Sequence, residues 1–196
     1  MPHIHTEPNQ HDVTVSAWIF RDHGNHVEVF VHMHRKMQKY MEVGGHMELD
    51  ETPWQAIAHE LVEETGYSLD ELELYQPSYM PTDLTNVIVH PVPTLVLTYQ
   101  PVPGHYHTDM SYVFYAKSEP LDVPNSGESQ DLRWMTFQEL SDGVLQGTVL
   151  SDVGELYPVL KKAIESDGYK RVATKQFSLS KPSLNEEVIE KLAKHG

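Results

Sequence analysis

Residues 45–67 read GHMELDETPWQAIAHELVEETGY, and this segment predicts a helix with an acidic face behind a Gly-Gly pair. Glu60, Glu63 and Glu64 follow one another at i, i+3 and i+4, so on a helix they share one face. Three neighbouring carboxylates without a local cation repel one another. The arrangement therefore indicates a divalent metal, Mg²⁺ first and Mn²⁺ second, because carboxylate ligands without cysteine suit hard cations.

The residues around the carboxylates predict a helix over residues 53–65. Thr52 can act as the N-cap, Pro53 suits the first helical position, and Gln55 completes a capping box. Gly66 stands where a helix commonly ends in a left-handed residue. Apolar residues at helical spacing predict a buried stripe roughly opposite the carboxylates: Trp54, Ile57, Ala58 and Leu61.

This segment resembles the Nudix box, whose pattern is Gly, five residues, Glu, seven residues, Arg-Glu-apolar-x-Glu-Glu-x-Gly-apolar. The residues that match at the required spacing are Gly45, Glu51, Glu60, Leu61, Glu63, Glu64 and Gly66. A match this long favours the family over an exposed acidic helix in an acidic protein. The resemblance implies an α/β protein with the Nudix fold, a mixed β-sheet sandwiched between α-helices.

Two positions depart from the family pattern. Tyr67 at the final apolar position is a mild change, whereas His59 replaces the family's arginine. By resemblance, that arginine orients the glutamates and pairs with the glutamate at position 51, here Glu51. Histidine is shorter, lacks the bidentate fork and is only partly charged near neutral pH. We expect activity to survive, with a rate and pH dependence that reflect His59.

The resemblance also implies which residues act in catalysis. Those that bind the metal are Gly45, through its carbonyl, Glu60, Glu63 and Glu64, with Glu63 assisting catalysis through the metal or its waters. The general base varies across the family, so Glu60 and Glu128 are both candidates, and Asp131 is a lesser one. Glu128 lies six residues before Trp134, in a loop where some members place a catalytic glutamate. The alternative for Glu128 is a solvated loop acid.

Basic residues close to the box could hold phosphates. The candidates for substrate binding are His34, Lys36, Lys39 and His46. A phosphoanhydride resists attack because its negative oxygens repel a nucleophile, and metal with a carboxylate base overcomes that barrier. The expected activity is Mg²⁺-dependent cleavage of a nucleoside diphosphate linked to another group, such as a nucleoside triphosphate or ADP-ribose. The alternative is a non-catalytic Nudix-fold module that senses a nucleotide or nucleotide sugar.

Composition limits the other possibilities. The formal net charge of −15 argues against binding a nucleic-acid polymer, and the absence of cysteine excludes disulfides and zinc-thiolate sites. No apolar run approaches the length of a membrane span, and the first ten residues lack the apolar core of a signal peptide. We therefore expect a cytoplasmic protein with a small phosphorylated substrate. A homodimer is a further possibility that the family suggests.

Patterning along the chain predicts a flexible leader (1–11), a Nudix domain (12–165) and a C-terminal tail (166–196) with a helix at about 184–194. The expected strands are 13–20, 27–34, 39–43, 72–75, 87–90, 94–99, 110–116 and 131–135. A helical turn is expected at 137–140 and a helix at 152–164, which contains Pro158.

His105, His107 and Asp109 alternate, so on a strand they share one face. His-x-His on a strand can bind metal, but a zinc site needs a third ligand that the sequence does not place. Substrate contact or structural pairing is therefore favoured for these histidines, and the same holds for His32 and His34.

Overall fold

The computed structural model describes residues 11–79 and 87–180. Across these residues the strands are β1 (His11–His23), β2 (His26–His34), β3 (Lys39–Met41), β4 (Val43–His46), β5 (Leu72–Pro77), β6 (Leu95–Val102), β7 (His105–Ala116), β8 (Leu132–Thr136) and β9 (Tyr169–Ala173). The α-helices are α1 (Pro53–Thr65), α2 (Phe137–Gln146) and α3 (Ser151–Ile164). The 3₁₀ turns are η1 (Leu69–Glu71) and η2 (Thr174–Gln176).

The strands form one mixed sheet. Its main path runs β3-β2-β1-β7-β5-β9, with β4 paired to β1, β6 to β7 and β8 to β2. β1 and β7 run parallel, whereas the other paired strands of the described sheet are antiparallel. Because β4 returns alongside β1, the Gly44-Gly45 pair lies across from Ser16 and Val15 at the centre of the sheet.

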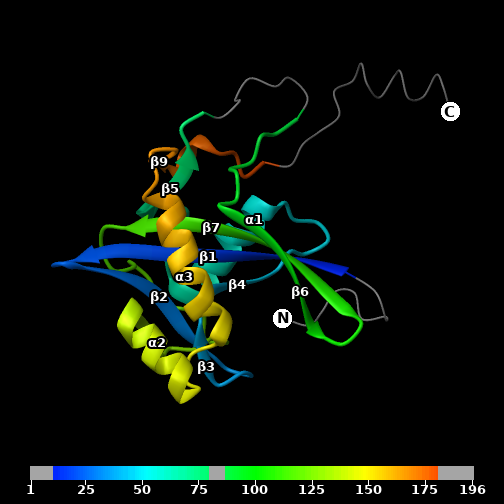
Figure 1. Cartoon of the computed structure of the whole chain (residues 1–196). Helices are drawn as coiled ribbons and strands as arrows, with labels where there is room; N and C mark the ends of the chain where they lie inside the picture. Colours follow the sequence, from blue (N-terminus) through cyan, green and yellow to red (C-terminus); the bar gives the residue numbers. More distant parts are fainter. Residues whose placement is uncertain (1–10, 80–86, 181–196) are drawn as a thin grey trace, which may run out of the picture.

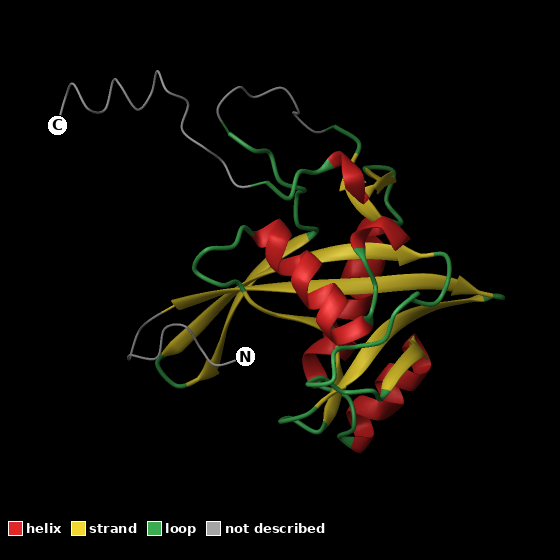
Figure 2. Cartoon of the chain, turned by 180° about the vertical axis from the view of Figure 1, so that it is seen from behind, coloured by secondary structure: helices red, strands yellow, loops and turns green. Residues whose placement is uncertain are grey.

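Helices cover both faces of the sheet, and α1 lies on the opposite side from α2 and α3 (Figures 1 and 2). One core cluster gathers Trp54, Ile57 and Leu61 of α1 against the sheet. A second cluster packs Leu140 of α2 and Leu160 of α3 against the other face. The predicted fold class, an α/β sandwich of a mixed sheet between helices, is confirmed.

The bounds and caps of α1 agree with the sequence prediction. The Thr52 hydroxyl accepts a hydrogen bond from the Gln55 amide at 3.3 Å, and the Gln55 side chain accepts one from the Thr52 amide at 2.9 Å. Gly66 ends the helix at a φ of 78°, and its amide donates to the Val62 carbonyl. The buried stripe differs in one residue, because Ala56 is buried and Ala58 is only half-buried.

The strand predicted at residues 87–90 is wrong, because this segment has no regular secondary structure. Its backbone continues towards Pro91 and Pro93, which cannot donate to a ladder. At Val92, between the two prolines, the side chain of Gln76 takes the place of a partner strand. Its amide nitrogen donates to the Val92 carbonyl at 2.8 Å, and its oxygen accepts from the Val92 amide at 2.9 Å.

The sheet continues beyond residue 165, where the sequence places the end of the domain. β9 pairs with β5, and Phe177 packs edge-on against Trp54 of α1. The helical turn expected at 137–140 is a full helix, α2. Most of the expected leader and the expected helix at 184–194 lie outside the described residues. None of the helices in the described ranges combines the length and the hydropathy that crossing a membrane requires.

Candidate active site

The Gly-Gly pair of β4 brings backbone directly against a carboxylate of α1. A methyl group placed on Gly45 would lie 2.1 Å from Glu60 Oε1, so only glycine allows this approach. The neighbouring Gly44 amide donates to Glu64 Oε2 at 2.9 Å. The strand and the helix therefore meet through Glu60 and Glu64, and the two carboxylates stand beside the Gly45 backbone.

Glu60 and Glu64 are buried, although the sequence suggests an open acidic face. Glu60 is 3% exposed and Glu64 is 7% exposed. Burial raises the pKa of Glu60 to about 7, and the nearby charge of Glu63 acts in the same direction. Burial, reinforced by the charge of Glu60, also raises the pKa of Glu64 well above its ordinary value. Two desolvated carboxylates that repel each other favour a cation between them.

Glu60 Oε1 is buried and has no hydrogen-bond partner among the described residues. An unpaired carboxylate oxygen in a protein interior is costly unless a ligand satisfies it. The neighbouring Glu64 offers a second buried carboxylate, and carboxylate oxygens suit Mg²⁺ or Mn²⁺. The residues present therefore fit a hard divalent metal.

His59 contacts two carboxylates of the same segment. Its Nδ1 lies 3.2 Å from Glu51 Oε1, and its Nε2 lies 3.1 Å from Glu63 Oε1. The histidine thus bridges the two glutamates, one through each ring nitrogen. Burial acts to lower the pKa of His59, but hydrogen bonding to Glu63 and the charges of Glu63 and Glu51 outweigh it and raise that pKa.

The loop between β7 and β8 reaches back to α1 through Asn125. The Asn125 amide donates to the Glu63 carbonyl at 2.8 Å, and its side chain donates to Glu63 Oε1 at 3.1 Å. The Glu128 amide in turn donates to the Asn125 carbonyl at 2.8 Å. Glu128 is half-buried, and its charge contributes to the raised pKa values of both Glu60 and Glu64. Sequence reasoning missed Asn125, since a loop asparagine carries no motif of its own.

Three of the four predicted phosphate-binding residues, His34, Lys36 and Lys39, lie at the turn between β2 and β3. His34 pairs with Lys39, and the two share the face of the sheet on which α1 lies. Burial, and the charge of Lys36 among nearby groups, lower the pKa of His34. Arg35 donates to the Gly127 carbonyl, which ties this turn to the loop that carries Glu128. Lys36 is exposed at the tip of the turn.

His32 lies deeper on the same face. Its Nε2 is 3.7 Å from Glu64 Oε2, and burial, with the charge of His34, lowers its pKa to about 4. A neutral imidazole therefore stands next to the carboxylate pair.

His46 has a different environment from the other predicted substrate residues. Gly45 is turned towards Glu60, so the next residue of β4 points to the opposite face. His46 Nε2 lies 3.3 Å from His107 Nε2 and 3.6 Å from Asp12 Oδ2. Its role beside a phosphate remains a prediction.

Asp131, the lesser candidate for the base, is engaged elsewhere. It accepts a hydrogen bond from the Tyr40 hydroxyl at 2.5 Å and forms an ion pair with Arg133 at 3.1 Å. The Tyr40 hydrogen bond, aided by Arg133, lowers the Asp131 pKa.

Replacing His59 by arginine is expected to increase the kcat/KM of the expected hydrolysis. The ratio of variant to wild type should rise several-fold as the pH increases. The imidazolium charge is present below the raised pKa of His59 and is lost as the pH rises through it, whereas arginine stays charged. The measurement is kcat/KM for both proteins from about pH 6 to about pH 9. His23→Arg is the matched control, because His23 also contacts a carboxylate, Glu28, but in the distant β1–β2 hairpin. A ratio that stays flat with pH would contradict the expectation.

Comparison with known proteins places this arrangement in context. The model of the NUDIX domain family matches residues 10–158. No curated protein matches the chain in a sequence search.

Many solved structures share the fold. A NUDIX-family hydrolase from Clostridium perfringens is 24% identical, with a TM-score of 0.60 over 79% of this chain and 96% of that one. The C. elegans Ap4A hydrolase is 17% identical, with a TM-score of 0.54 over 80% and 100%. The NUDIX domain of Shewanella oneidensis NrtR, solved with ADP ribose, is 16% identical, with a TM-score of 0.55 over 78% and 88%.

Proposed function

The chain belongs to the NUDIX family of hydrolases, and we propose that it is a Mg²⁺-dependent pyrophosphohydrolase. The bond cleaved is a phosphoanhydride in a nucleoside diphosphate linked to another group, such as a nucleoside triphosphate or ADP-ribose. Mn²⁺ is the expected substitute for Mg²⁺, because both prefer oxygen ligands.

One observation carries this proposal. Glu60 Oε1 is a buried carboxylate oxygen that lies against Gly45 without a hydrogen-bond partner among the described residues. Glu64 stands beside it, equally desolvated. Burying two neighbouring carboxylates, one of them with an unpaired oxygen, destabilises the folded state unless a cation neutralises them.

The residues that would hold the metal are Glu60, Glu63, Glu64 and the Gly45 carbonyl. When bound, Mg²⁺ supplies charge neutralisation for the phosphates and lowers the pKa of a coordinated water. Gly44 fixes the Glu64 carboxylate through its 2.9 Å hydrogen bond. His59 orients Glu63 and Glu51 from either side of its ring.

Two residues are proposed as alternatives for the general base. Glu60 is the first, because its Oε1 is buried against Gly45 with no hydrogen-bond partner among the described residues. Glu128 is the second, because Asn125 and Arg35 hold its loop against α1 and the β2–β3 turn. Each would accept the proton of the attacking water.

The substrate phosphates are proposed to lie along the β2–β3 turn. His34, Lys36 and Lys39 offer imidazole and ammonium donors there, on or near the face that carries the glutamates. Proteins of similar structure include an Ap4A hydrolase, a NUDIX domain complexed with ADP ribose and a UDP-X diphosphatase. They support a nucleotide with a pyrophosphate linkage as the substrate class.

The second candidate function is a binding module that recognises a nucleotide without cleaving it. His59 in place of arginine favours this alternative, since it weakens the orientation of the glutamates. The retained set of Glu60, Glu63 and Glu64 favours the hydrolase.

The test is release of phosphate or nucleoside monophosphate from a panel of nucleoside triphosphates, dinucleoside polyphosphates, ADP-ribose and nucleotide sugars. Hydrolysis of at least one class in Mg²⁺, abolished by EDTA and recovered with added Mg²⁺, is the expected result. Binding of a panel member without turnover in Mg²⁺ or Mn²⁺ would establish the module instead.

A further inference from the structure

A second cluster of ligand-type side chains lies where β1, β4 and β7 meet, at one end of these strands. Asp12 is near the start of β1, His105 and His107 open β7, and His46 ends β4. The parallel register sets Asp12 beside His107, and the antiparallel register pairs His46 with Thr14. These side chains project to the face opposite α1, so the cluster is separate from the glutamate site.

The ligand atoms converge. His105 Nε2 lies 3.2 Å from Asp12 Oδ2, and His46 Nε2 lies 3.6 Å from the same oxygen. His107 Nε2 is 3.1 Å from His105 Nε2 and 3.3 Å from His46 Nε2. Tetrahedral zinc with bonds of about 2.0–2.1 Å holds neighbouring ligand atoms roughly 3.3 Å apart. The four separations lie near that spacing. The ligand atoms of Asp12, His105 and His107 all lie within 4.8 Å of one another, and His46 approaches this group from the side of Asp12 and His107.

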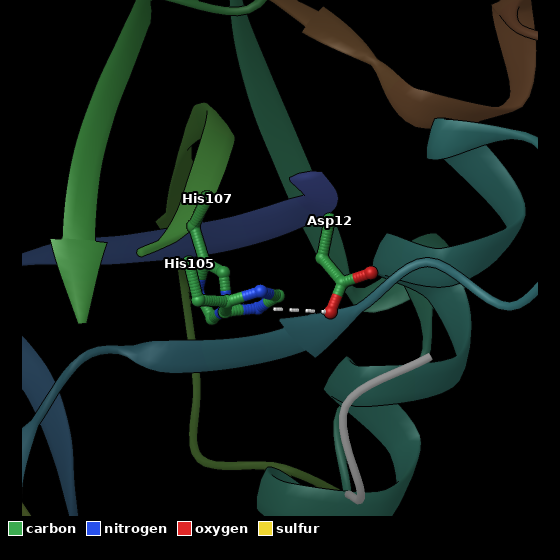
Figure 3. Close-up of side chains that lie close together, drawn as sticks. All are labelled: Asp12, His105 and His107. Carbon is green, nitrogen blue, oxygen red and sulfur yellow. Dashed lines mark hydrogen bonds and ion pairs between the residues drawn. The ribbon is translucent and has the colours of Figure 1, made fainter. Parts of the chain in front are cut away.

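The cluster is buried. Asp12 is 1% exposed, His107 4% and His105 6%. Figure 3 shows the two β7 imidazoles and the Asp12 carboxylate turned towards one another, with the His105–Asp12 contact drawn. Buried carboxylates are normally paired or bound to metal. Three imidazole Nε2 atoms gathered around one carboxylate form a donor set of three nitrogens and one oxygen.

The surroundings of His107 supply a partner for its other nitrogen. His107 Nδ1 lies 3.1 Å from the Tyr99 hydroxyl of β6. A histidine that binds metal through Nε2 carries its proton on Nδ1 and donates it to a neighbouring oxygen. The Tyr99 hydroxyl is placed to accept that proton and to hold the His107 ring in the orientation that a metal site requires.

We propose that Asp12, His105 and His107, with His46 as the fourth ligand, bind a Zn²⁺ ion. Imidazole nitrogen suits Zn²⁺ rather than Mg²⁺, so the two metals would occupy different sites on this chain. The ion would link β1, β4 and β7, and through His46 it would fix the end of β4 that follows Gly45. The role is structural, and it does not depend on the proposed hydrolase activity.

Asp109, which alternates with the two histidines in sequence, is not part of this cluster. It accepts hydrogen bonds from the hydroxyls of Thr14, Ser16 and Ser111 at 3.0, 2.8 and 2.6 Å. The third ligand that the sequence does not place is Asp12, which lies more than ninety positions earlier in the chain. Only the pairing of β1 with β7 brings it to the histidines.

The experiment titrates the metal-stripped full chain with Zn²⁺ in excess Mg²⁺, by calorimetry and by thermal melting. One Zn²⁺ per chain and a higher melting temperature are expected for wild type, because a ligand that binds only the folded state stabilises it. His105→Ala/His107→Ala is expected to weaken Zn²⁺ binding by more than about 100-fold, and Tyr99→Phe by roughly 10-fold. Asp12→Asn preserves the shape of the site and is the second variant if the double variant fails to fold.

Three controls define the site. His23→Ala/His26→Ala removes two exposed hairpin histidines and is expected to leave Zn²⁺ binding unchanged. His3→Ala/His5→Ala tests the N-terminal histidines, and Glu60→Gln/Glu64→Gln tests the glutamates, with the same expectation. Co²⁺ in place of Zn²⁺ should give the intense visible absorption of a tetrahedral nitrogen site. The proposal is overturned if wild type binds no Zn²⁺, if binding persists in folded Asp12→Asn, or if either the N-terminal or the glutamate variant abolishes it.

Discussion

The Glu64→Gln variant is expected to lose hydrolase activity by about 10²–10⁴-fold, the range for removing one catalytic group. Glutamine keeps the size of the side chain, and its oxygen can still accept the Gly44 amide hydrogen bond. What it loses is the negative charge that a divalent metal requires. The measurement is single-turnover hydrolysis at saturating Mg²⁺, with the best substrate found in the panel.

The same variant should melt no lower than wild type in EDTA. Burial raises the Glu64 pKa, so the folded state holds this proton more tightly than the unfolded state does. The stability that this group contributes is present at low pH and is lost as the pH rises from the ordinary value of 4.5 through the raised pKa. The advantage of glutamine is therefore largest at a pH above that raised pKa.

Glu155→Gln is the matched control, because Glu155 is an exposed carboxylate of α3, on the other face of the sheet. It should change neither activity nor melting. Full activity in Glu64→Gln, or equal losses in both variants, would contradict the catalytic assignment.

The Gly44→Ala variant is expected to lose about 3 kcal/mol of folding free energy, at the upper end for an overpacked interior. A methyl group on Gly44 would lie 2.2 Å from the Val15 carbonyl oxygen and 2.9 Å from Ser16 Cα. Both are backbone atoms of the paired strand β1, which cannot move without breaking the sheet. The expected fall in melting temperature is on the order of 10 °C.

Gly45→Ala makes the same chemical change one residue later and should have the opposite outcome. Its methyl group would meet the Glu60 carboxylate, which can rotate away at little cost to the fold. This variant should therefore melt near the wild-type temperature but bind Mg²⁺ weakly and lose activity. Thermal melts of both variants with and without Mg²⁺ make the comparison. Equal stability of the two proteins would show that contact with β1 does not limit position 44.

Local sequence was sufficient to predict the bounds of α1 and to identify the family. Thr52, Gln55 and Gly66 act within a few residues of one another, so the helix ends could be predicted without tertiary structure. The spacing of Glu60, Glu63 and Glu64 follows from the helical period alone. The strand predicted at residues 87–90 was wrong for the converse reason. The segment is followed by Val92, whose backbone is paired by the side chain of Gln76, a residue distant in sequence.

What the sequence determined by itself is the segment that carries the three glutamates, because its helix, its caps and the spacing of its carboxylates depend on near neighbours. Only the tertiary structure decided which residues from distant parts of the chain surround that segment and which of them form the second cluster. Asn125 fastens the Glu128 loop to Glu63, and the parallel pairing of β1 with β7 carries Asp12 to His105 and His107. The physical reason is that strand pairing joins residues far apart in the chain, and no local pattern records which strand will become the partner.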